Sequence, residues 1–107
     1  MSRLAAAVLL SFSLGAIAAG EPEYALAIEN HKFTPDRIEV PAGKKVKLLV
    51  ENKDATPEEF ESSALKIEKV IPGKSKATIF VGPLKPGEYK FVGEFNEKTA
   101  KGVIVAK

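Results

Sequence analysis

The chain has 107 residues, with 16 basic and 14 acidic side chains and a formal net charge of +2. A charge balance this close to zero argues against binding to nucleic acid or to an anionic membrane surface. There is no cysteine, and the single methionine is Met1. The remainder of the chain therefore has no disulfide and offers no sulfur ligand to a soft metal ion.

The first nineteen residues have the pattern of a secretory signal peptide. Arg3 supplies the early positive charge, and an uncharged, mostly apolar stretch follows from Leu4 to Leu14. Ala16–Ala18 then has the small-x-small pattern that signal peptidase requires. The stretch is shorter than the roughly 20 residues that cross a bilayer. We therefore expect a signal peptide over residues 1–19, cleavage close to Gly20, export to the periplasm, and no membrane insertion after cleavage.

Residues 20–107 are predicted to form one domain made of short strands. Apolar and polar residues alternate with the period of a half-buried strand, and Pro/Gly turns separate the segments. Short strands at 8–12-residue spacing predict an all-β Greek-key β-sandwich of about seven strands. The expected strand segments are Tyr24–Ile28, Ile38–Val40, Val46–Val50, Glu58–Ser62, Leu65–Ile71, Ala77–Val81, Tyr89–Phe91 and Gly102–Ala106.

Three other local features complete this prediction. Phe33-Thr34-Pro35 is expected to be a crossing between strands, and only Asn96–Lys101 suggests a helical turn. The core should hold the alternating aliphatic residues together with four aromatic ones, namely Phe33, Phe60, Tyr89 and Phe91.

Three motifs, taken together, resemble the cupredoxin family. Phe33–Gly43 is similar to its aromatic-x-Pro crossing followed by an Ile-x-Val strand and a Gly turn. Asn52-Lys53-Asp54, followed by Phe60, resembles the loop before the family's first ligand strand. Pro83–Phe91 resembles the Pro-Gly-x-Tyr-x-Phe approach to its copper-binding loop. The resemblance covers about Tyr24 to Lys107 and implies a cupredoxin-like fold.

The same resemblance implies where copper ligands would lie. The first His of the family falls on Glu58 and its Cys on Gly93, while the second His falls near Asn96 and the Met near Ala100. All four ligands are replaced, so we do not expect type 1 copper or blue-copper electron transfer.

Glu59-Phe60-Glu61 gives a more specific resemblance. It is similar to the Glu-aromatic-Glu strand in the non-blue cupredoxin domain of bacterial periplasmic iron-uptake proteins, the EfeO type. The Cys pair of that family corresponds to Phe33 and Gly93, and an acidic residue of the family corresponds to Lys90. The resemblance implies iron as the bound ion and an inner-membrane iron permease as partner, with fewer ligands than the family pattern.

The acidic residues themselves also suggest a metal site. In a strand, Glu59 and Glu61 share one face, while Glu58 shares the other with Phe60. Clustered carboxylates suit iron or another hard cation, and mutual repulsion should raise their pKa values until a cation relieves it. The candidate metal ligands are Glu58, Glu59, Glu61, Glu94, Glu97 and His31.

A second interpretation of these acids remains open. They would form a solvated face paired with neighbouring lysines, and the protein would be a metal-free binding module that docks a partner protein through its acidic rim. His31 lies in a polar stretch that also fits an exposed loop. The expected lysine partners are Lys66, Lys69, Lys90 and Lys98.

No enzymatic activity is expected. The chain has no cysteine nucleophile, one histidine, and no serine in a Gly-x-Ser-x-Gly setting. The glycines lie at turns rather than in a phosphate-binding loop.

Overall fold

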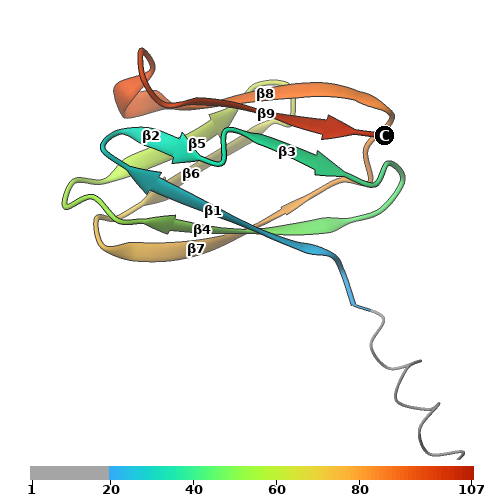
Figure 1. Cartoon of the computed structure of the whole chain (residues 1–107), viewed down its shortest axis with the longest axis horizontal. Coiled ribbons are helices and arrows are strands. Elements are labelled where there is room, and N and C mark those ends of the chain that lie inside the picture. Colours follow the sequence, from blue (N-terminus) through green and yellow to red (C-terminus); the bar gives the residue numbers. More distant parts are fainter. Residues whose placement is uncertain (1–19) are drawn as a thin grey trace, which may run out of the picture.

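The computed structural model describes residues 20–107, so the predicted signal peptide lies outside the described residues. The described part forms nine β-strands and one 3-10 helix (Figure 1). Their bounds are β1 Glu23–Glu29, β2 Lys32–Thr34, β3 Arg37–Val40, β4 Val46–Asn52, β5 Glu58–Ser62, β6 Ile67–Ile71, β7 Ser75–Val81, β8 Gly87–Gly93, η1 Glu94–Asn96 and β9 Lys101–Ala106.

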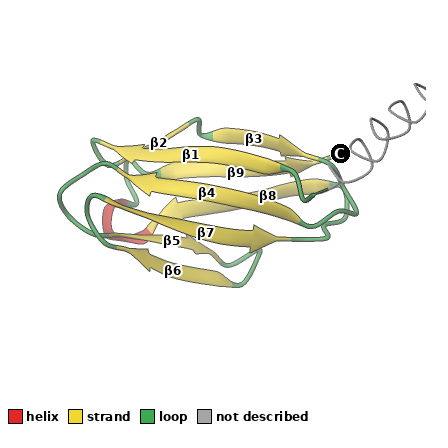
Figure 2. Cartoon of the chain, turned by 90° about the horizontal axis from the view of Figure 1, so that it is seen from below, coloured by secondary structure: helices red, strands yellow, loops and turns green. Residues whose placement is uncertain are grey.

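The strands form two sheets that pack face to face as a sandwich. One sheet has the order β2-β1-β4-β7 and the other the order β3-β9-β8-β5-β6. Figure 2 shows β1, β4 and β7 in front of the second sheet. The β1–β4 and β3–β9 pairs are parallel and the other pairs are antiparallel. The prediction of an all-β sandwich is therefore confirmed.

The structure has nine strands, more than the predicted number of about seven; each of the eight segments proposed as strands is present, and the ninth strand is β2. Lys32–Thr34, predicted as part of a crossing, is the strand β2 and pairs with the end of β1. The two-residue turn between these strands is Asn30-His31, and both residues have positive φ (55° and 58°), as in the type I′ turn that suits a hairpin.

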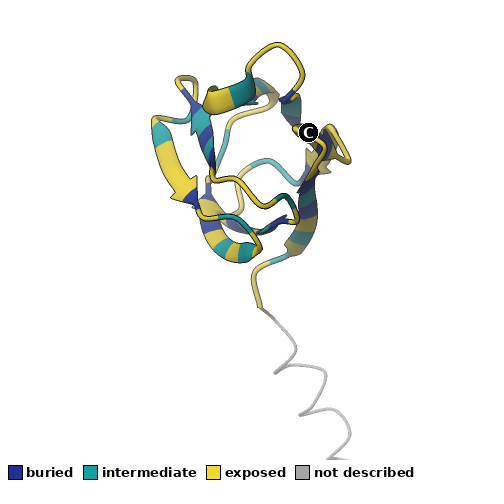
Figure 3. Cartoon of the chain, turned by 90° about the vertical axis from the view of Figure 1, so that its left-hand side faces the viewer, coloured by how far each residue is buried: buried dark blue, intermediate teal, exposed yellow. Residues whose placement is uncertain are grey.

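The core lies between the two sheets and contains an aromatic cluster. In strands such as β4 and β5 every second residue is buried, and Figure 3, an end-on view, shows buried positions alternating with more exposed ones along strands of the sandwich. The Phe60 and Phe91 rings stack with centroids 4.8 Å apart, and Phe33 meets Phe91 edge-on at 4.9 Å. These three rings confirm the predicted aromatic core.

Tyr89 differs from the other predicted core aromatics, because it packs only partly buried against the core. Its hydroxyl donates a hydrogen bond of 2.7 Å to the carbonyl oxygen of Lys85. The polar end of the ring thus ties down the connection between β7 and β8, since a phenolic hydroxyl near the core needs a hydrogen-bond partner.

A helical turn was predicted over Asn96–Lys101, whereas the 3-10 helix η1 lies at Glu94–Asn96, between β8 and β9, and shares only Asn96 with that range. The backbone amides of Thr99 and Ala100 then donate to the carbonyl oxygen of Asn96 at 3.1 and 2.8 Å. η1 packs against β5 at one end of the sandwich (Figure 1). Among residues 20–107, no helix has the length and apolar character needed to span a membrane.

Candidate functional site

The four positions that the cupredoxin resemblance equates with copper ligands meet at the η1 end of the sandwich. Asn96 Nδ2 donates to Glu58 Oε2 at 2.7 Å, and the Gly93 amide donates to the Ala100 carbonyl at 2.9 Å. A Cβ placed on Gly93 would lie 2.7 Å from both Ala100 Cβ and Glu58 Cδ. The fold thus brings these four residues into one pocket and fills it with their own atoms.

The Glu58 carboxylate is buried in this pocket, with the residue only 2% exposed. Oε1 accepts hydrogen bonds from the backbone amides of Glu59 (2.9 Å) and Phe95 (2.8 Å), and Oε2 accepts the one from Asn96. A buried carboxylate is costly unless it is hydrogen-bonded, and these three donors meet that need. Within residues 20–107, no buried side-chain nitrogen or oxygen lacks a partner.

This donor set does not fit the copper ion that the fold family implies. A blue-copper site needs a thiolate and two imidazoles, whereas these positions supply one carboxylate, one amide and no other side-chain donor. The carboxylate lone pairs are directed at N–H groups, which would repel a cation. The pocket is therefore arranged as an anion pocket that holds the carboxylate of the chain itself.

The other four glutamates predicted as metal ligands lie outside this pocket, together with Glu68. We call Glu59, Glu61, Glu68, Glu94 and Glu97 the acidic rim. Glu59 and Glu61 are half-buried on β5, and Glu68 stands opposite Glu61 in the β5–β6 register. Loss of hydration raises the pKa of Glu59 and of Glu61 above the ordinary value of 4.5, and repulsion from Glu94 and Glu68 acts in the same direction.

The lysine pairing expected for these acids is not found. Every ion pair closer than 4 Å within residues 20–107 involves other carboxylates, such as Glu23 with Lys47 at 3.2 Å and Glu39 with Lys107 at 3.2 Å. Within residues 20–107 the rim carboxylates therefore have no ion-pair partner within 4 Å. Phe95, which follows the rim residue Glu94 in η1, has 53% of its surface exposed.

His31 belongs to a different local structure. Its Nδ1 lies 3.5 Å from Asp54 Oδ2, and Asp54 also accepts hydrogen bonds from the backbone amides of Asn30 (2.8 Å) and His31 (3.0 Å). The hydrogen bond from the His31 amide is the main cause that lowers the pKa of Asp54 below 3.8. Asp54 thus stabilises the left-handed β1–β2 turn, and none of the described contacts joins His31 to the rim.

The six predicted metal ligands therefore lie in three settings. Glu58 is inside the pocket, His31 is in the β1–β2 turn, and the other four are on the rim. In the described part of the chain, no group of three or more His, Asp or Glu side chains is placed to hold a metal ion. Metal binding by these residues remains a prediction.

The sequence reasoning missed the role of Asn96. It treated Glu58 and Asn96 as two separate losses of a copper ligand, although they are a hydrogen-bonded pair. The sequence did contain a signal for this pair. The two positions were expected to be neighbours, and an amide N–H can donate a hydrogen bond to a carboxylate.

Comparisons with known proteins agree with this fold. The sequence pattern of the family described as "Cupredoxin-like domain" matches residues 2–106. The uncharacterised protein RP394 of Rickettsia prowazekii (strain Madrid E) is 42% identical over 83 residues, which are 78% of this chain. The matched region spans 66% of the length of that relative.

Solved structures resemble the protein in fold at low sequence identity. The apo form of a copper-binding protein has a TM-score of 0.73 at 16% identity, with 83% of this chain and 90% of that chain covered. The metal-binding domain of the Cu(I)-exporting ATPase CopA of Streptococcus pneumoniae D39 has a TM-score of 0.68 at 16% identity (79% and 84% covered). Auracyanin A of Chloroflexus aurantiacus, a blue copper protein, has a TM-score of 0.67 at 14% identity (82% and 100% covered). By its sequence pattern and its sandwich topology, the chain belongs to the cupredoxin-like family.

Proposed function

We propose that this protein is an exported, metal-free cupredoxin-like module that docks a partner protein through its acidic rim. The observation that carries this proposal is the Glu58 carboxylate, which lies buried in the ligand pocket with three N–H donors directed at it. A scaffold whose metal pocket is filled by its own hydrogen bonds is suited to present a surface rather than an ion.

The surface beside this pocket has the features of a docking site. The rim carries negative charge that no lysine within residues 20–107 neutralises by an ion pair, and the exposed Phe95 directly follows the rim residue Glu94 in η1. Aromatic side chains are enriched at protein interfaces, and a charged rim increases the rate of encounter with an oppositely charged surface. The partner should therefore present a basic surface with an apolar pocket for Phe95.

The EfeO-type resemblance suggests an inner-membrane iron permease as the first partner to test. The full-length protein, exported by its own N-terminal segment, would be cross-linked in cells and capture of the permease quantified. Because Glu59→Gln and Glu61→Gln remove rim charge and Phe95→Ala removes the ring, we expect the triple variant to reduce capture at least tenfold. Glu88→Gln, at the far end of β8, is the matched control. Equal capture by the triple variant and the control would contradict docking through the rim.

Localisation is checked separately in the same cells. The pattern of residues 1–19 leads us to expect the protein in the periplasmic fraction, with a new N-terminus at Ala19 or Gly20. An uncleaved chain that stays with the cytoplasmic fraction would overturn export.

A second candidate function is the binding of a hard cation, iron first, on the rim. The specific observation is that the pKa of Glu59 and of Glu61 is raised and that both are repelled by Glu94. A cation bound between these carboxylates would relieve the repulsion. Titration with ferric, manganous and cupric ions separates the two functions. Ferric binding that disappears in Glu59→Gln/Glu61→Gln would favour this candidate, and the absence of binding would favour docking alone.

A further inference from the structure

The two sheets of the sandwich end unevenly on one side. The five-stranded sheet ends in β6 and the four-stranded sheet ends in β7, which follows β6 directly in the chain. In Figure 2, β6 lies beyond β7, and no strand of the four-stranded sheet within residues 20–107 faces it. We call the space beside β7 and facing β6 the open position.

The exposure of Lys69 is further evidence for this space. In the β5–β6 register Lys69 stands opposite Phe60, so both side chains lie on the inner face of their sheet. Phe60 is fully buried between the sheets, whereas Lys69 is exposed. A side chain on an inner face reaches solvent only where the other sheet does not cover it. Lys69 has no ion-pair partner within 4 Å in the described part of the chain.

The backbone of β7 has unpaired groups on the side of the open position. The amide of Lys47 in β4 donates to the carbonyl oxygen of Pro22, which precedes β1 (2.9 Å), so the odd-numbered residues of β4 direct their backbone groups toward β1. In an antiparallel pair, directly opposite residues alternate between exchanging hydrogen bonds and facing away from each other. The residues opposite the odd-numbered ones therefore direct their N–H and C=O groups into the open position. We call them the edge residues, and they are Lys76, Thr78 and Phe80.

A pocket lies at the Val81 end of the open position. It has a volume of about 360 Å³ and is lined mainly by apolar residues from the start of β6, the end of β7 and the neighbouring connections. They include Leu65, Ile67, Val81, Pro83 and Leu84. Ile67 lies two residues before Lys69 on β6. The pocket and the lysine are therefore separated by the distance between two successive side chains on one face of a strand.

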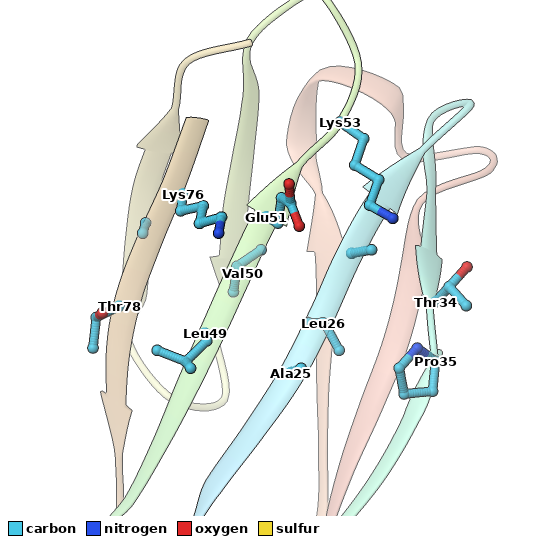
Figure 4. A pocket seen from close by; sticks show the side chains of 12 residues that line it. Ala25, Leu26, Thr34, Pro35, Leu49, Val50, Glu51, Lys53, Lys76 and Thr78 are labelled. Carbon is cyan, nitrogen blue, oxygen red and sulfur yellow. The ribbon is translucent and has the colours of Figure 1, made fainter. Parts of the chain in front are cut away.

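Lys69 supplies the charge that faces the open position. Lys76 lies on the outer face of the four-stranded sheet, where it is in register with Glu51 and extends toward it (Figure 4). Glu68, the neighbour of Lys69 in sequence, is opposite Glu61 in the register and lies on the outer face of its own sheet. Neither of these residues changes the sign of the charge inside the open position.

We propose that the open position binds an extended segment of a partner protein as a fifth strand of the four-stranded sheet. The backbone of the segment pairs with the edge residues, as in other cases of strand addition to a free sheet edge. We assign the antiparallel direction, which gives slightly more stable pairing. One inner-face side chain of the segment is apolar and fills the pocket. The next one, two residues further along, is acidic and pairs with Lys69.

The edge strands of the protein itself do not have this apolar-x-acidic pattern. The sheet edges within residues 20–107 are β2, β3, β6 and β7, and β2 and β7 contain no acidic residue. In β3, Glu39 points away from the buried Ile38 and Val40. In β6, Glu68 shares a face with Val70 but precedes it, which is the reverse of the order that antiparallel pairing needs. The pattern therefore selects a different protein rather than a second copy.

Selection from a displayed library of random peptides tests the chemistry of the segment, with the protein produced from its full-length gene as bait. The wild type should enrich peptides with an apolar-x-acidic pattern. Lys69→Glu should bind these peptides at least about tenfold more weakly, because like charges then meet, and should enrich apolar-x-basic peptides instead. Lys32→Glu is the matched control, because Lys32 is exposed on β2 at the opposite edge of the four-stranded sheet. No enriched pattern, or the same pattern with Lys69→Glu, would overturn the proposal.

Amide hydrogen exchange tests whether the peptide is added as a strand. In the free protein the amides of the edge residues should exchange faster than those of Ala77 and Ile79, which face β4. A bound peptide should slow exchange of the edge amides at least about tenfold. Thr78→Pro removes one donor on the free side of an edge strand, where proline is tolerated, and should weaken binding while circular dichroism stays unchanged. Binding without slower exchange would overturn strand addition. Slower exchange in the free protein as its concentration rises would identify a second copy as the occupant and would equally overturn the proposal.

Discussion

Glu58 and Gly93 form a mutually dependent pair at the centre of the former ligand pocket. A Cβ on Gly93 would lie 2.7 Å from Glu58 Cδ and Oε2, closer than carbon and oxygen atoms approach without displacement. The carboxylate cannot move away freely, because Phe95 and Asn96 hold it from the η1 side. The buried carboxylate therefore requires glycine at position 93, and its hydrogen bonds join β5 to η1, which lies between β8 and β9.

Removal of the carboxylate should destabilise the fold. Glu58→Ala leaves buried N–H donors without acceptors and opens a cavity, so we expect the free energy of unfolding to fall by about 2–4 kcal/mol. Glu58→Gln keeps the volume but turns an amide N–H toward a donor, and should cost about 1–2 kcal/mol. Urea unfolding measures both changes. Glu88→Ala, on the exposed end of β8, should stay within about 0.5 kcal/mol of the wild type. If Glu58→Ala unfolds at the wild-type midpoint, the carboxylate has no anchoring role.

The contact between the two residues predicts coupling. Gly93→Ala should cost about 1–3 kcal/mol, because the added methyl group overpacks the pocket. In the Glu58→Ala background the same change should cost at least about 1 kcal/mol less, since space has been opened where the methyl group points. A double-mutant cycle in urea gives the coupling energy. Additive effects would mean that the pocket relaxes independently around each residue.

At the scale of elements, the β5 strand separates two kinds of acidic residue. Its alternation directs Glu58 into the sandwich and Glu59 and Glu61 toward the rim, next to Glu94 of η1. The inward carboxylate holds η1 in place, and the outward ones repel it. At the η1 end of the sandwich, the hydrogen bonds of Glu58 therefore stabilise the contact between β5 and η1, while repulsion among the rim carboxylates opposes it.

This balance predicts a pH dependence. The pKa of Glu59 and of Glu61 is raised in the folded state, so the native protein binds these protons more tightly than the unfolded chain. The destabilisation from the ionised pair is present above the raised pKa and is relieved as the pH falls through it toward the ordinary value of 4.5. The double variant Glu59→Gln/Glu61→Gln should therefore have a higher free energy of unfolding than the wild type at neutral pH. This difference in free energy should become smaller as the pH is lowered.

Urea midpoints measured between about pH 7 and pH 5 check this prediction. The range stays above the pH at which Asp54, whose pKa is lowered below 3.8, begins to lose its contribution to the β1–β2 turn. Glu88→Gln is the matched control variant. If the urea midpoints of the double variant and the wild type differ by a constant amount over this range, or differ more at lower pH, then repulsion between the ionised carboxylates does not destabilise the fold.

At the scale of the whole molecule, the sandwich still brings the four ligand positions together although their chemistry has changed. Restoring donors should therefore restore a copper site. The combined change Glu58→His, Gly93→Cys, Asn96→His and Ala100→Met supplies two imidazoles, a thiolate and a thioether. We expect this variant to bind copper with an intense visible absorption band, and the wild type to remain colourless under the same titration. A folded quadruple variant, verified by circular dichroism, that takes up no copper would show that the pocket no longer has a ligand geometry.

Much of the fold could be predicted from local sequence. The alternation at Glu58–Ser62 and at Val46–Val50 identified two strands whose inward residues are buried. β2 was missed because its three residues lie beside Pro35 and are too few to show a period. Its pairing depends on the Asn30-His31 turn and on Asp54, which is 24 residues from Asn30. Tyr89 was placed in the core by its aromatic ring, but its hydroxyl bond to Lys85 keeps it partly exposed.

The candidate site could be predicted only as a set of residue types. The sequence alone determined that sulfur donors are missing and that carboxylates stand near the former ligand positions, because composition and strand period are local properties. Only the tertiary structure decided what those carboxylates face. Glu58 meets Asn96, 38 residues away, while Glu59 and Glu61 meet other carboxylates. The difference arises because a hydrogen bond depends on the direction and distance of its donor, and both are set by how η1 packs on β5.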